Sequence, residues 1–265
     1  MKLSTTELQD LKNAVQLLEN PGIAAKIVNV IGMPLEKGMK MLPNKVTDKI
    51  VKITQKSLLK VADVAVLTMN NNRGEKSSNG LHTASVAVTG GIGGFFGMYG
   101  LAIELPVSTT IMFRSIADIA RSEGESINDP LTKLACLMVF ALGGTTKSDD
   151  GTEVGYFAVR AALARSVAEA AEFIATKTLV EEGAPALIRL ITSIAQKFSI
   201  QVSEKTVAQA VPFIGAAGGA LANTVFISHF QDMARGHFIV RRLERKYGED
   251  FIKSEYEKVN IKSAA

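Results

Sequence analysis

Apolar and polar residues alternate along this chain with the period of an α-helix. The first such segment follows Ser4, which together with Glu7 forms the sequence signature of a capping box. Apolar residues three and four apart continue from there to Leu18, and Pro21-Gly22 ends the segment. Strand-like alternation with a period of two does not persist along the chain. The pattern therefore predicts an all-α protein.

Residues 44–68 have the clearest amphipathic pattern. On a helix, their apolar residues fall on one arc and their lysines on a narrow adjoining arc. We call this row the lysine face; it consists of Lys45, Lys49, Lys52, Lys56 and Lys60. Such a row is typical of a solvated helix face. It also suits attraction to anionic lipid, to which each basic residue contributes on the order of 1 kcal/mol.

Two stretches, residues 83–103 and 206–228, are apolar, rich in glycine and free of charge. The first ends at Glu104. On a helix, glycines three and four apart form a smooth face against which a second helix packs closely. The glycines expected at this contact are Gly93, Gly97, Gly100, Gly215 and Gly219. We therefore predict a multi-helix bundle with these two glycine-rich apolar helices packed together at its centre.

Both stretches are about long enough to cross a membrane, since a spanning helix needs roughly 20 apolar residues. Against spanning are Glu104, Pro212 and several polar side chains, and the mean hydropathy of +0.18 is low for a polytopic membrane protein. We expect a buried helical hairpin, with shallow insertion into a membrane surface as the alternative. The polar amino terminus does not resemble a signal peptide.

The remaining pattern completes a single domain over residues 1–265. Amphipathic helices occupy residues 1–80, the core occupies 81–248 and a charged tail helix follows Gly248. Within the core, further helices are expected at 107–121, at 131–142 after the cap Asp129-Pro130, at 152–179, at 186–198 and at 220–247. Pro106 is expected to kink or restart its helix. The single cysteine, Cys136, excludes an internal disulfide and fits a reducing compartment and a place in the core.

Several charged or titratable residues lie among apolar ones, where a buried charge must be paired. They are Glu104, Arg114, Asp118, Arg160, His229, Asp232, Arg235 and His237. These residues either form a buried polar network, with Arg114 and Asp118 four apart and able to pair, or build a binding site. His229 and Asp232 are three apart and could both ligate one metal ion, with Glu104 or Asp118 completing the set.

No other motif of known chemistry is present. Gly90-Gly-Ile-Gly-Gly94 lacks the lysine and hydroxyl residue of a phosphate loop, and no nucleophile motif occurs. The formal charge of +4 is not accompanied by a nucleic-acid-binding motif. We therefore expect no cofactor, no metal, no catalytic residues and no nucleic-acid partner, and the metal site remains an alternative.

Several motifs resemble those of the EcsC protein family. They are residues 104–110 (ELPVSTT), 114–120 (RSIADIA), 155–161 (GYFAVRA), 212–219 (PFIGAAGG) and above all 229–248 (HFQDMARGHFIVRRLERKYG). The resemblance extends from about Pro21 to Gly248. The family is named after a gene that neighbours the ATPase and membrane subunits of an ABC transporter, and its biochemical activity is unassigned. The resemblance thus implies a helical, bacterial, membrane-linked protein and supplies no catalytic residues.

These observations lead to one main hypothesis and two alternatives. The main hypothesis is a non-enzymatic, cytoplasmic protein at the inner face of the cell membrane. It would bind lipid or another amphiphile between the glycine-rich helices, with the lysine face toward anionic headgroups. The alternatives are a metal-dependent enzyme using His229 and Asp232, and a structural partner of an ABC transporter that docks through the apolar hairpin. The oligomeric state is open.

Overall fold

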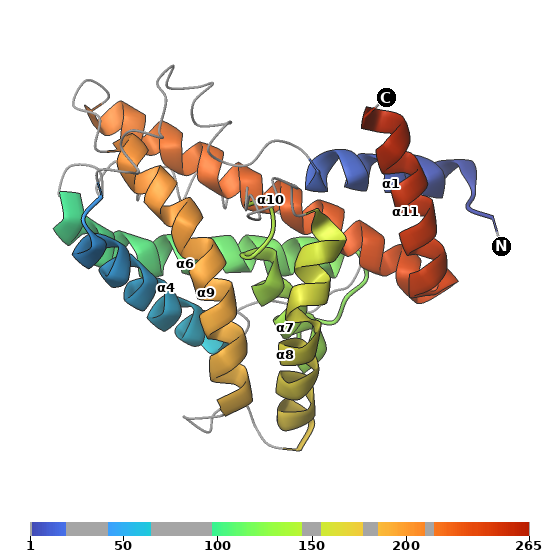
Figure 1. Cartoon of the computed structure of the whole chain (residues 1–265), viewed down its shortest axis with the longest axis horizontal. Helices are drawn as coiled ribbons and strands as arrows, with labels where there is room; N and C mark the ends of the chain where they lie inside the picture. The colour runs from blue at the N-terminus through green and yellow to red at the C-terminus, as the bar shows by residue number, and fades with distance from the viewer. Residues whose placement is uncertain are drawn as a thin grey trace.

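The computed structural model describes residues 2–19, 42–64, 97–144, 155–176, 185–209 and 215–264. Every helix or strand within these ranges is an α-helix, which confirms the all-α prediction (Figure 1). The helices are α1 (Thr5–Leu18), α4 (Asn44–Val64), α6 (Gly97–Ser122), α7 (Pro130–Val139), α8 (Tyr156–Thr176), α9 (Pro185–Gln209), α10 (Gly215–Tyr247) and α11 (Glu249–Ala264).

Local sequence signals determine several helix ends. At the start of α1, the Glu7 backbone N–H donates to Ser4 Oγ and the Ser4 N–H donates to the Glu7 carboxylate, so the capping box is present. The side chain of Asp129 accepts a hydrogen bond from the backbone of Leu131 and caps α7. Gly248 separates α10 from α11 with φ of +89°, a backbone conformation that favours glycine.

The longest described helix, α10, organises the others. It has 33 residues and is therefore about 50 Å long. It contacts α1, α6, α7, α9 and α11, and Figure 1 shows it running across the length of the molecule beside α6. On the other side, α4 contacts both α6 and α9. Because α6 and α9 each contact α4 and α10, these four helices enclose a common core.

Aromatic side chains fill the middle of this core. The rings of Phe140, Phe198, Phe226 and Phe230 have centroid separations from 4.8 to 5.9 Å. They link the end of α7 with α9 and α10, and such ring pairs contribute about 0.5–1.5 kcal/mol beyond the area they bury. Cys136 is buried in the same core, as predicted, and burial raises the pKa of its thiol well above the ordinary value.

Two helix predictions need correction, and a third concerns residues that are only partly described. Of residues 206–228, residues 206–209 belong to α9 and α10 begins at Gly215, while residues 210–214 lie outside the described ranges. The helix predicted at 186–198 extends to Gln209, since polar residues in its last turns find partners across the core. Pro106 does not restart the helix, because α6 continues through it.

The structure describes only part of the predicted pair of central helices. α6 and α10 are in contact. Residues 83–96, including Gly93, lie outside the described residues, as do residues 210–214 of the second stretch. The role of Gly97, Gly100, Gly215 and Gly219 as contact points therefore stays a prediction. Among the helices that the structure describes, none is both long enough and apolar enough to cross a bilayer.

Candidate functional site: buried ion pairs and an exposed basic helix

Glu104, the acid at the end of the first glycine-rich stretch, belongs to a buried ion pair. Its Oε1 accepts hydrogen bonds from Lys205 Nζ at 2.7 Å and from Asn223 Nδ2 at 3.3 Å. The side chains of Lys205 and Glu104 are 0% and 4% exposed. The pair therefore joins α6, α9 and α10 inside the four-helix core, where an unpaired charge would be strongly unfavourable.

Sequence reasoning missed Lys205, although one signal pointed to it. Lys205 immediately precedes the uncharged stretch 206–228, just as Glu104 immediately follows the uncharged stretch 83–103. Two opposite charges at the borders of two apolar stretches are natural partners if those stretches pack together. The ammonium group also lies 5.0 Å from the centre of the Phe226 ring, which adds a cation–π contact.

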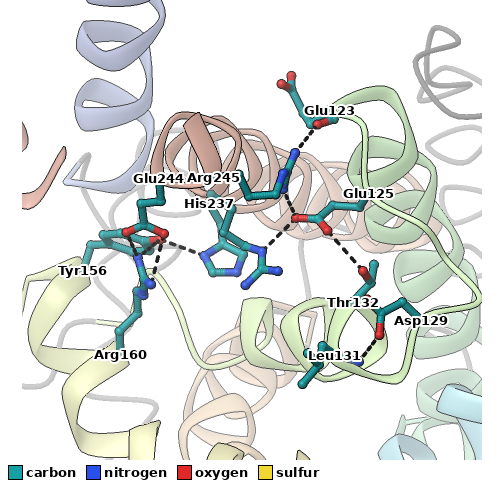
Figure 2. Close-up of polar contacts among 11 residues, drawn as sticks. Glu123, Glu125, Asp129, Leu131, Thr132, Tyr156, Arg160, His237, Glu244 and Arg245 are labelled. Atoms are coloured by element: carbon teal, nitrogen blue, oxygen red, sulfur yellow. Dashed lines mark hydrogen bonds and ion pairs between the residues drawn. The ribbon is translucent and has the colours of Figure 1, made fainter. Parts of the chain in front are cut away.

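A second polar network surrounds Arg160 and connects α8 with α10. Arg160 binds the Glu244 carboxylate through two hydrogen bonds, at 2.6 and 3.2 Å. Arg160 also donates to the Tyr156 hydroxyl, which is hydrogen-bonded at 2.8 Å to Nδ1 of His237 (Figure 2). Burial and the positive charges of Arg241 and Arg160 hold the pKa of His237 well below its ordinary value, so its imidazole is neutral.

Glu125 forms a third network with the basic end of α10. Its carboxylate accepts from Arg241 Nε at 2.9 Å, from Thr132 at 3.1 Å and from Arg245 (Figure 2). Arg245 also donates to the backbone carbonyl of Glu123. These contacts hold the turn between α6 and α7 against α10. The arginines in this part of the 229–248 motif thus stabilise helix packing.

The other predicted site residues differ in their surroundings. Asp118 pairs with Arg121 at 2.6 Å, so the predicted pairing with Arg114 is wrong, because three residues along the helix bring Arg121 within reach. Nε of Arg114 is buried without a hydrogen-bond partner among the described residues. Asp232 is half-buried and Arg235 is exposed.

His229 is completely buried beside the residues that follow α7. Gly143 has φ of +71°, and a Cβ added there would lie 2.5 Å from the His229 ring. The His229 ring therefore lies so close to the Gly143 backbone that this position requires glycine. Within the described ranges, no three histidine, cysteine, aspartate or glutamate side chains gather as they would to hold a metal ion. The geometry gives no support to the predicted ligand set of His229, Asp232 and Glu104 or Asp118.

Glu204 is a buried carboxylic acid at the end of α9. Burial raises its pKa from 4.5 to about 7. Because the folded state binds this proton more tightly than the unfolded state, Glu204 lowers stability as pH rises from about 4.5 to about 7, and the loss persists above that range.

We therefore expect Glu204→Gln to stabilise the protein at pH 8, by about 3 kcal/mol, and to have little effect at pH 4.5. Denaturant unfolding of both proteins across this pH range measures the difference. A difference that stays constant with pH would show that the Glu204 carboxyl has an ordinary pKa.

The lysine face of α4 is exposed along its whole length. All five of its lysines are exposed, and the buried residues Ile50, Leu58 and Val61 lie on the opposite side of the helix. At 100° per residue, the lysines occupy an arc of about 80°. On this face, a positive charge therefore recurs at every turn of α4.

The described chain is thus an all-α bundle with buried charge pairs and an exposed basic face on α4. Comparison with protein families matches residues 5–243 to the EcsC protein family, so the chain belongs to that family. The match extends from α1 through most of α10 and includes Glu104, Lys205, Arg160 and His237. No curated protein and no solved structure matches the chain.

Proposed function

We propose that this EcsC family member is a non-enzymatic, cytoplasmic protein that associates peripherally with the inner face of the cell membrane. The observation that carries the proposal is the lysine face of α4, with five exposed lysines on one arc opposite the buried side. Each basic residue held near an anionic bilayer contributes on the order of 1 kcal/mol, so the row together supports reversible, peripheral association.

The buried polar residues support a structural role rather than a catalytic one. Glu104 is bound by Lys205, Glu244 is bound by Arg160, and Glu125 is bound by Arg241. Each acid is thus held by a base from another helix, an arrangement that fixes helix packing.

Binding of an amphiphile between the glycine-rich stretches concerns residues 83–96 and 210–214, which lie outside the described ranges. An ABC transporter as partner follows from the family resemblance, and co-purification with membrane subunits tests it.

Vesicle flotation tests the proposal. We expect the protein to float with vesicles containing about one-third phosphatidylglycerol, and to bind them more weakly as salt rises, because salt screens exposed charges. The triple variant Lys52→Glu, Lys56→Glu and Lys60→Glu should bind at least about a hundredfold more weakly, since three attractions of about 1 kcal/mol become repulsions.

A matched control reverses three exposed lysines on other helices: Lys12→Glu, Lys253→Glu and Lys258→Glu. This variant has the same net charge as the first, so it should bind nearly as well as the wild type if the lysine face is the contact. Equal loss in both variants, or wild-type binding that is indifferent to lipid charge, would contradict the proposal.

A further inference from the structure

We propose that Leu59 of α4 and Ile188 of α9 form an apolar anchor that enters the acyl boundary of an anionic bilayer. This inference rests on the proposed membrane association and identifies the side chains that would leave water. Both side chains belong to the described surface, and both are 38% exposed. They lie where the lysine face meets the neighbouring helix.

The register between α4 and α9 brings the two side chains together. Gln55 Nε2 of α4 donates to Thr192 Oγ1 of α9 at 2.9 Å, and Figure 1 shows the two helices running in opposite directions. Leu59 follows Gln55 by four residues, and Ile188 precedes Thr192 by four. In an antiparallel pair, both therefore lie about one turn further along in the same direction.

The position of Leu59 on α4 places this pair at the edge of the lysine face. At 100° per residue, Leu59 lies about 20° from Lys52 and about 60° from Lys56. Lysine side chains cover apolar neighbours with their methylene stems and keep the ammonium group in water. A bilayer surface accepts both parts at once, because phosphates bind the ammonium groups while the acyl boundary takes up Leu59 and Ile188.

The binding partner of this surface is a bilayer rather than a single lipid molecule or another protein. The lysine face runs from Lys45 to Lys60, which is about 22 Å along the helix axis. A row of this length matches an extended anionic surface. Apolar burial is not screened by salt, so the anchor predicts binding that persists in part after the charge attraction has been suppressed.

Flotation at high salt tests the anchor. We expect the double variant Leu59→Ser and Ile188→Ser to bind phosphatidylglycerol vesicles about tenfold more weakly than the wild type at high salt, because partly exposed apolar area no longer enters the bilayer. The matched control is Leu131→Ser with Ile261→Ser, which removes two exposed apolar side chains from α7 and α11. The control should bind like the wild type.

A gain-of-binding variant avoids the question of misfolding. Leu59→Trp should increase high-salt binding, since tryptophan favours the membrane interface. Suppose that the Leu59→Ser and Ile188→Ser double variant and the Leu59→Trp variant each bind like the wild type, while the triple lysine variant loses binding. The anchor is then wrong and the proposed function stands. If the wild type does not bind anionic vesicles, both proposals are wrong.

Discussion

Replacing Lys205 with methionine is expected to lower the free energy of unfolding by about 3–5 kcal/mol. Methionine has a similar length, so packing changes little, but Glu104 loses the ammonium group 2.7 Å away and stays buried. Among the described residues, the hydrogen bond from Asn223 at 3.3 Å then remains to its carboxylate. Denaturant unfolding followed by circular dichroism measures the loss.

The partner variants separate pairing from packing. Glu104→Gln should also be destabilising, because it leaves the Lys205 ammonium group buried without an anion. The double variant Glu104→Leu and Lys205→Met should recover most of the stability, since replacing a buried pair with apolar side chains is often neutral or stabilising. Single variants that each lose under about 1 kcal/mol, with additive effects, would contradict a buried pair at this position.

The second large effect is expected at Arg160. Its replacement by methionine removes both hydrogen bonds to Glu244, whose side chain is 6% exposed. We expect a loss of about 3 kcal/mol at pH 8. Burial already raises the pKa of Glu244, and loss of the guanidinium raises it further.

The pH dependence of the Arg160 variant follows from that shift. With a folded-state pKa above the unfolded value, Glu244 takes up a proton in the folded state first, so stability recovers as pH falls from 8 toward 5. Unfolding of both proteins at the two pH values measures this. The matched control is Arg165→Met, which breaks an exposed pair with Glu169 and should lose less than about 0.5 kcal/mol. A loss at Arg160 that does not change with pH would show that Glu244 keeps its charge by another contact.

The elements that local sequence determines could be predicted. The capping box of α1, the cap at Asp129 and the stop at Gly248 each depend on a few adjacent residues. The amphipathic character of α4 and the exposure of its lysines also follow from the periodicity alone. The need for Glu104 to be paired followed from the cost of burying a charge.

The identity of the partners could not be predicted, because it depends on how distant helices pack. Lys205 lies 101 residues from Glu104, and Glu244 lies 84 residues from Arg160. Nothing local distinguishes Glu244 from the exposed acids of the charged tail. The choice between Arg114 and Arg121 as the partner of Asp118 depends on which side of α6 faces the core, and the i+4 rule alone pointed to the wrong one.

Fractionation of the source cells tests the proposed peripheral membrane association most directly. Lysate is separated into membrane pellet and supernatant, and the pellet is then washed with alkaline carbonate. We predict that the protein pellets with the membranes at low salt and that the carbonate wash releases it, whereas the Lys52→Glu, Lys56→Glu and Lys60→Glu variant stays in the supernatant. Wild-type protein that stays in the low-salt supernatant, or that resists carbonate like an integral protein, would contradict the account.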